Sequence, residues 1–194
     1  MASKSLRELM AQADERGLAA SGLACLDRCL PLLASEADAL RPLWAGLVEG
    51  EEDWSLRLAE ARETMESAAV DDEAAVLVRQ MLGAAPSEWE VDPLREWADD
   101  CSVAALELHH RFDAGPGTEV PAAAEVVDVL KRCREGEPDR AGPLVAGELR
   151  RQVQILEILA DAEGGVGLRQ ALDVSTEGQR VLRAVVSRRA RVRR

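Results

Sequence analysis

The segment from Pro143 to Ala162 constrains the fold more than any other part of this chain. A proline at the first helical position and the Gly164-Gly165 pair beyond the end are typical of a helix start and stop. With residues about 100° apart around the axis, the apolar ones cover roughly 220°, about twice a surface helix's usual stripe. They are Leu144, Val145, Leu149, Val153, Ile155, Leu156, Ile158 and Leu159. We therefore expect this segment to contact several neighbours as the central helix.

Few residues in the rest of the chain favour a β-sheet. Aromatic residues make up 3% of the 194 residues, and long runs of β-branched residues are rare. Capping patterns and helical spacing predict an all-α, single-domain helical bundle or array of about eight to nine helices around the central helix near 143–162. The expected segments are 5–16, 22–30, 35–48 (one kinked helix or two short ones), 54–68, 71–82, 93–112, 121–133, 143–162 and 176–194.

The charge is unevenly distributed along the chain. The formal net charge is −12, yet the residues from Arg180 onward include seven arginines and no acid, which leaves −19 on residues 1–179. We expect an acidic helical body, 1–179, and within the same domain an amphipathic helix at 176–194 with a basic end. The basic tail comprises Arg180, Arg183, Arg188, Arg189, Arg191, Arg193 and Arg194. Such a tail can bind nucleic acid, an acidic partner or the protein's own body.

Three polar residues interrupt the apolar arc of the central helix: Glu148, Arg151 and Gln152. Their spacing lets Glu148 meet Arg151 or Gln152 on one helix face. One interpretation is an intrahelical pair satisfied at the edge of the core. The other is a polar cluster that lines a groove or interface and contacts a partner or ligand.

The cysteines and histidines are weak candidates for a metal site. Cys25 and Cys29 lie one helical turn apart, and His109 flanks an apolar stripe. Structural zinc sites usually carry two closely spaced cysteine pairs, whereas Cys101 and Cys133 stand singly on other apolar stripes. We therefore expect reduced thiols in the core, a buried and hydrogen-bonded histidine, and no cofactor.

A second pattern concerns residues 167–182, which faintly resemble a helix-turn-helix. A short helical stretch at 168–172 precedes the turn, and Ser175 or Thr176 is placed to begin the next helix. Three positions depart from the pattern: Arg169 where a small residue is usual, Asp173 in place of the turn glycine, and Gln179 at a buried aliphatic position.

No phosphate-binding loop, dinucleotide-binding glycine motif, nucleophile elbow or zinc-protease motif occurs in the sequence. We predict a non-enzymatic helical interaction or regulatory protein that binds a protein partner or itself. The first alternative is a nucleic-acid-associated transcriptional regulator that uses the arginine-rich helix, and the second is a metal- or ligand-binding α-helical enzyme. Without a long apolar run or a signal-peptide pattern, we expect a cytoplasmic location and no membrane contact.

Overall fold

The computed structural model describes residues 4–33, 39–49, 52–66, 73–113, 123–137, 141–162 and 165–192. Across these ranges it contains nine α-helices, one 3₁₀ turn at Leu30–Leu33 and no strand, which confirms the all-α, single-domain prediction. The helices are α1 Leu6–Gln12, α2 Glu15–Cys29, α3 Arg41–Glu49, α4 Trp54–Glu66, α5 Glu73–Gly83, α6 Val91–Asp113, α7 Ala123–Arg134, α8 Pro143–Asp161 and α9 Gly165–Val192.

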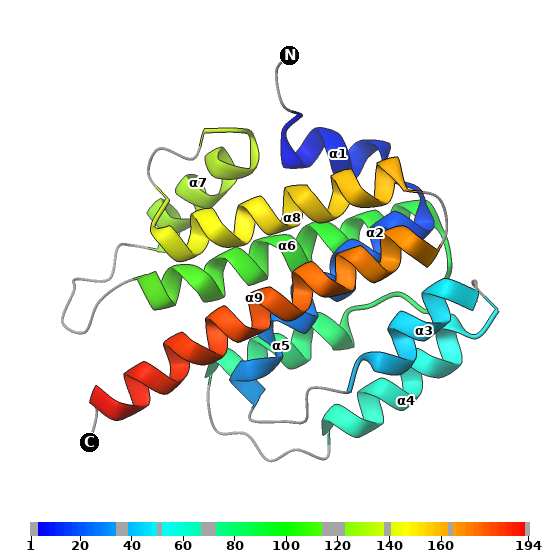
Figure 1. Cartoon of the computed structure of the whole chain (residues 1–194), viewed down its shortest axis with the longest axis horizontal. Coiled ribbons are helices and arrows are strands. Elements are labelled where there is room, and N and C mark those ends of the chain that lie inside the picture. The colour runs from blue at the N-terminus through cyan, green and yellow to red at the C-terminus, as the bar shows by residue number, and fades with distance from the viewer. Residues whose placement is uncertain are drawn as a thin grey trace.

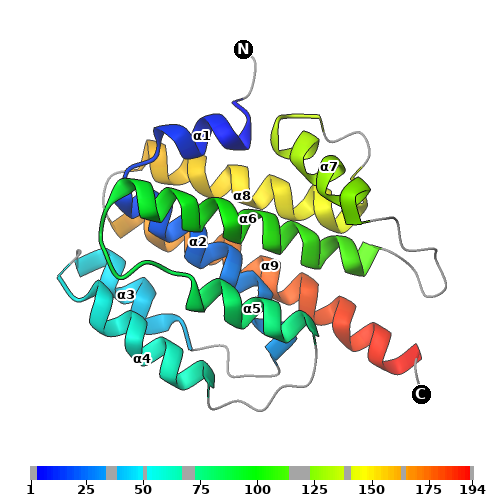
Figure 2. The same ribbon diagram turned by 180° about the vertical axis from the view of Figure 1, so that it is seen from behind.

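Four long helices, α2, α6, α8 and α9, form the body of the bundle (Figure 1). On one side of them lie α1 and α7, and on the other lie α3, α4 and α5, as the reverse view also shows (Figure 2). The predicted central helix, α8, packs against α1, α2, α6 and α9. It shares the centre with α2, in which every residue from Gly17 to Cys29 is buried.

Two glycines allow α2 to approach its neighbours closely. A Cβ atom added to Gly22 would lie 2.6 Å from the indole ring of Trp97 on α6. A Cβ atom added to Gly178 of α9 would lie 2.4 Å from Cδ of Arg28 on α2. Since real Cβ atoms do not approach other atoms so closely, these two crossings require a residue without a side chain.

The start of α8 is capped by another helix. Gly142 precedes α8 and has no side chain to cap it. Instead the carboxylate of Asp113, the last residue of α6, accepts hydrogen bonds from the backbone N–H groups of Leu144 (2.9 Å) and Val145 (3.0 Å). A carboxylate at a helix N-terminus satisfies free N–H groups and complements the helix dipole.

Two predicted helix boundaries are wrong at the N-terminal end. Gly17 does not end a helix that runs to Arg16, because α1 ends at Gln12 and the chain is extended at Ala13. Asp14 then caps α2, accepting a hydrogen bond from the Gly17 N–H at 2.8 Å. Gly17 therefore lies in the first turn of α2, and α2 begins well before the predicted residue 22.

The predicted break within residues 168–176 is also wrong. The chain is one continuous helix from Gly165 to Val192, so the helix-turn-helix resemblance has no turn. Ser175 is buried inside α9, and the Thr176 hydroxyl donates to the carbonyl of Leu172 at 3.0 Å instead of capping a helix. No proline interrupts this segment, and tertiary contacts of Ser175 favour continuation of the helix.

The apolar faces of the described helices are largely buried. On α6, Leu94, Trp97, Cys101, Ala105 and Leu108 are buried, and Phe112 is half-buried against the core. On α7, Leu130 and Cys133 are buried, whereas Val127 is 60% exposed. None of the described helices has both the length and the apolar character needed to cross a bilayer.

Candidate functional site

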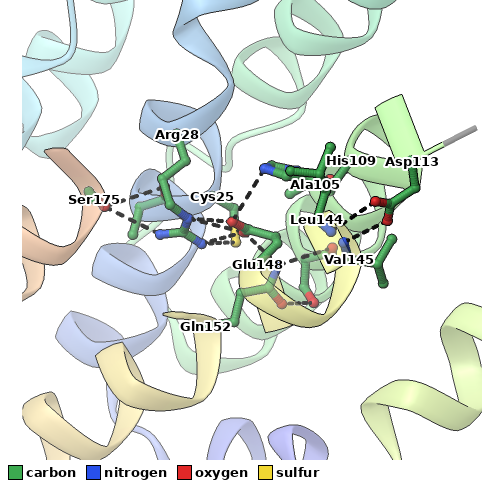
Figure 3. Close-up of polar contacts among 12 residues, drawn as sticks. Cys25, Arg28, Ala105, His109, Asp113, Leu144, Val145, Glu148, Gln152 and Ser175 are labelled. Atoms are coloured by element: carbon green, nitrogen blue, oxygen red, sulfur yellow. Dashed lines mark hydrogen bonds and ion pairs between the residues drawn. The ribbon is translucent and has the colours of Figure 1, made fainter. Parts of the chain in front are cut away.

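A cluster of buried polar side chains joins the four long helices. We call it the buried polar cluster, and it comprises Arg28, Ser102, His109, Glu148, Gln152 and Ser175. Figure 3 labels all of these residues except Ser102. At its centre Arg28 of α2 faces Glu148 of α8, and both side chains are 0% exposed. The Arg28 Nε donates to the Glu148 carboxylate at 2.8 Å, and Nη2 donates to Oε1 at 2.6 Å. This is a bidentate, charge-assisted hydrogen-bonded ion pair.

The remaining members satisfy the other polar atoms of this pair. Gln152, one turn after Glu148, donates to Oε1 at 3.0 Å, and its own carbonyl accepts from Ser102 of α6 at 2.6 Å. The Arg28 Nη1 donates to the Ser175 hydroxyl of α9 at 3.3 Å, and Nη2 contacts the Cys25 sulfur at 3.5 Å. A buried ion pair is tolerated when its polar atoms are hydrogen-bonded in this way.

His109 of α6 lies on the other side of the Glu148 carboxylate. Its Nδ1 is 2.7 Å from the carbonyl oxygen of Ala105, which can only accept, so Nδ1 carries a proton. Its Nε2 is 3.7 Å from Oε2 of Glu148. His109 Nε2 therefore lies near the carboxylate without a direct hydrogen bond to it.

These contacts hold Glu148 in its charged form. Burial by itself raises the pKa of Glu148, but Arg28, His109 and the hydrogen bonds from Arg28 and Gln152 lower it from 4.5 to about 2. Burial lowers the pKa of Arg28, whereas Glu148 raises it above the ordinary value. Both groups are therefore ionised at neutral pH, and neither is poised to exchange a proton in a reaction.

The sequence-predicted trio is only partly brought together. Glu148 and Gln152 are buried and hydrogen-bonded to each other. Arg151 is half-buried and is not the partner of Glu148; its Cδ lies near Gly178 of α9, 3.1 Å from where a Cβ atom would be. Sequence reasoning missed Arg28, although Asp27-Arg28 is the only charged pair in the otherwise apolar stretch 17–30. An isolated charge in so apolar a helix indicates a buried partner.

Asp27, beside Arg28, is the least satisfied carboxylate of the described residues around this cluster. Its side chain is buried, and Oδ2 has no hydrogen-bond partner. Burial raises the pKa of Asp27 from 3.8 to about 7, against the opposing effects of Arg28 and a hydrogen bond with Gln179. In the folded protein this carboxyl is therefore mostly protonated below about pH 7.

The candidate metal ligands lie in the core. Cys25, Cys29, Cys101 and Cys133 are buried free thiols. Burial raises the pKa of Cys25 to about 12 and that of Cys29 well above 9.0, so both thiols are protonated at neutral pH. Among the residues whose positions are described, no three His, Cys, Asp or Glu side chains are grouped to hold a metal ion.

The basic tail divides into two faces of α9. Arg180, Arg183, Arg188 and Arg191 are exposed, and we call these four the basic face. Arg189 points the other way: its guanidinium lies 4.9 Å above the Phe112 ring and donates to the Phe112 carbonyl at 2.8 Å. Arg193 and Arg194 lie outside the described residues.

The last turns of α9 reach beyond the neighbouring helices in both views (Figures 1 and 2). Arg189 is the last residue of α9 with a described anchoring contact, which it makes to the end of α6. No member of the basic face makes an ion pair with another residue of the described ranges. Four positive charges are thus left to face solvent or a partner.

Comparison of the chain with protein-family models, with curated proteins and with solved structures gave no significant match. The functional proposal therefore depends on the residues themselves.

Proposed function

We propose that the protein is a non-enzymatic helical interaction protein with a regulatory role, and that it binds an anionic macromolecule through the basic face. The observation that carries this proposal is the segregation of charge. Four exposed arginines without an ion-pair partner in the described ranges lie on a helix end, in a chain whose net charge is −12. Complementary charge steers association and sets the orientation of a partner.

The buried polar cluster supports a structural role for the rest of the domain. Arg28 and Glu148 are each 0% exposed, so a ligand cannot reach them without opening the bundle. Their contacts join α2, α6, α8 and α9 and hold α9 against the other three helices. The bundle thereby presents the basic face on a fixed support, and arginine has the planar donor geometry that recognises carboxylates and phosphates.

The other predictions from the sequence have less support. A metal- or ligand-binding enzyme would need accessible reactive groups, whereas Cys25 and Cys29 are buried and protonated. The cytoplasmic location stays part of the proposal, and four free thiols fit a reducing compartment. Self-association also remains part of it, and sedimentation velocity at low and high salt measures it directly.

A charge-neutralised variant tests the proposed function. The four residues of the basic face are changed to glutamine, and a control changes four exposed cations elsewhere: Arg7, Lys131, Arg150 and Arg169. Both variants have the same net charge. We expect wild type and control to bind heparin, poly-glutamate or duplex DNA at about 0.15 M salt, and the basic-face variant to lose binding while keeping its helical circular dichroism and Tm. Equal binding by all three proteins would refute the proposed function.

A further inference from the structure

The basic face has the dimensions of a nucleic-acid contact. From Arg180 to Arg191 the helix rises about 16 Å, at about 1.5 Å for each residue. Around the axis its four arginines cover roughly 140° at about 100° for each residue. Charges spread over such a width can reach phosphates on two strands, because the major groove of B-DNA is about 12 Å wide and admits a helix.

Small side chains lie between these arginines. Ala184 and Ser187 line a shallow hollow together with Arg180, Arg183, Arg188 and Arg191. All six residues are exposed. The small side chains of Ala184 and Ser187 leave room for a phosphate chain to approach the helix between the longer arginines. The Ser187 hydroxyl adds a neutral donor of the type found in phosphate contacts.

We infer, on the basis of the proposed function, that the anionic partner is double-stranded nucleic acid, bound through its phosphate backbone. A duplex carries one negative charge for about every 1.7 Å of its axis, a denser and more regular array than an acidic protein surface offers. No aromatic residue occurs between Arg180 and Arg191. Since proteins that bind single strands add aromatic stacking to their basic grooves, this composition favours a duplex.

The acidic body does not prevent this contact. At about 0.15 M salt, electrostatic interactions between exposed charges fall off over about 8 Å. The end of α9 reaches beyond the neighbouring helices (Figure 1), so we expect the arginines to dominate the local electrostatic potential there. On the same side of α9, the exposed acids Asp173 and Glu177 precede Arg180 and mark where the basic face ends. Glu177→Gln is therefore expected to strengthen duplex binding.

Fluorescence anisotropy with a labelled 24-base-pair DNA of mixed sequence tests the inference on the full chain. Each phosphate contact contributes about −0.9 to the slope of log K against log salt. Neutralising the basic face should therefore make the slope shallower by about 3.6, and wild type should lose about 150-fold more affinity than the variant between 50 and 200 mM salt. A fourfold Arg→Lys variant keeps the wild-type slope, because the charges remain.

The outcomes separate this inference from the proposed function. Salt-dependent duplex binding that the basic-face variant loses and the four-cation control retains supports both. Binding of heparin or poly-glutamate through the basic face, without duplex binding at 50 mM salt, overturns the nucleic-acid inference and leaves the proposed function standing. A labelled single strand bound as tightly as the duplex overturns the preference for double strands. Duplex binding that survives neutralisation of all four arginines overturns the inference that the basic face makes this contact.

Discussion

Replacing Glu148 by glutamine removes one charge from the buried polar cluster and leaves the Arg28 guanidinium buried without its counter-ion. Removal of one partner from a buried ion pair typically costs about 3–5 kcal/mol. The pKa of Glu148 gives an independent value: it falls from 4.5 to about 2 on folding, and at about 1.4 kcal/mol for each pKa unit this corresponds to about 3 kcal/mol. Both routes predict that Glu148→Gln lowers the free energy of unfolding at pH 7 by about 3 kcal/mol.

Urea unfolding followed by circular dichroism measures this difference. The matched control is Glu107→Gln, because Glu107 pairs with Arg111 at the surface, where the side chains are 39% and 37% exposed. Surface pairs of this kind contribute about 0.3–0.5 kcal/mol. A third protein, Arg28→Met with Glu148→Leu, removes both charges and should be more stable than Glu148→Gln alone, since no charge is left buried and unpaired.

The pH dependence of the stability difference between wild type and Glu148→Gln is the more stringent test. A carboxyl whose pKa is lowered on folding contributes stability above its unfolded value, here 4.5, and loses it as the pH falls through about 2. The difference between wild type and Glu148→Gln should therefore be constant from pH 5 to 7 and shrink below pH 4.5. A difference below 1 kcal/mol at pH 7, or one that stays constant down to pH 2, would show that the Arg28–Glu148 contact is not the buried charge pair described above.

Three further perturbations follow from the same packing. The pKa of Asp27 is raised from 3.8 to about 7, so this carboxyl contributes stability below pH 3.8 that is lost as the pH rises through 7. In urea unfolding, the free energy of unfolding of Asp27→Asn should therefore rise by about 4 kcal/mol relative to that of wild type between pH 4 and 8. A difference between the two proteins that does not change with pH would contradict this. Gly178→Ala should lower the free energy of unfolding by about 1–3 kcal/mol through overpacking on Arg28, whereas Gly83→Ala, with no atom within 4 Å, should not destabilise. Asp113→Ala should cost about 1–2 kcal/mol in the same assay, and an unchanged midpoint would argue against the cap on α8.

Local patterns in the sequence predict much of this fold but not its long-range contacts. The helical class follows from composition, and the inward placement of Glu148 and Gln152 follows from the apolar arc around them. The partner of Glu148 could not be predicted, because Arg28 lies 120 residues earlier in the chain. Local spacing offered Arg151 or Gln152 as partners of Glu148, and of these two only Gln152 makes a hydrogen bond to it.

Tertiary packing also explains the boundary errors. Gly17 reads as a helix end from local chemistry alone, yet Asp14 caps a helix that contains it. Residues 173–176 read as a turn, yet the Ser175 side chain contacts Arg28 and the carbonyl of Ala24 inside a continuous α9. The basic face could be found from the sequence as a run of arginines. That Arg189 does not belong to the basic face could be seen only from its contact with Phe112 in the structure.

The distance in sequence between Arg28 and Glu148 also bears on how the chain folds as it is synthesised. Arg28 leaves the ribosome 120 residues before Glu148, and Ser175 follows later still. Until α8 is available, burying α2 would place an uncompensated cation in an apolar environment, which costs several kcal/mol. We expect the N-terminal helices to stay solvated until α8 joins them, so that the bundle closes late and cooperatively. Pulse-labelling hydrogen exchange should then show protection of α2 and α8 appearing together.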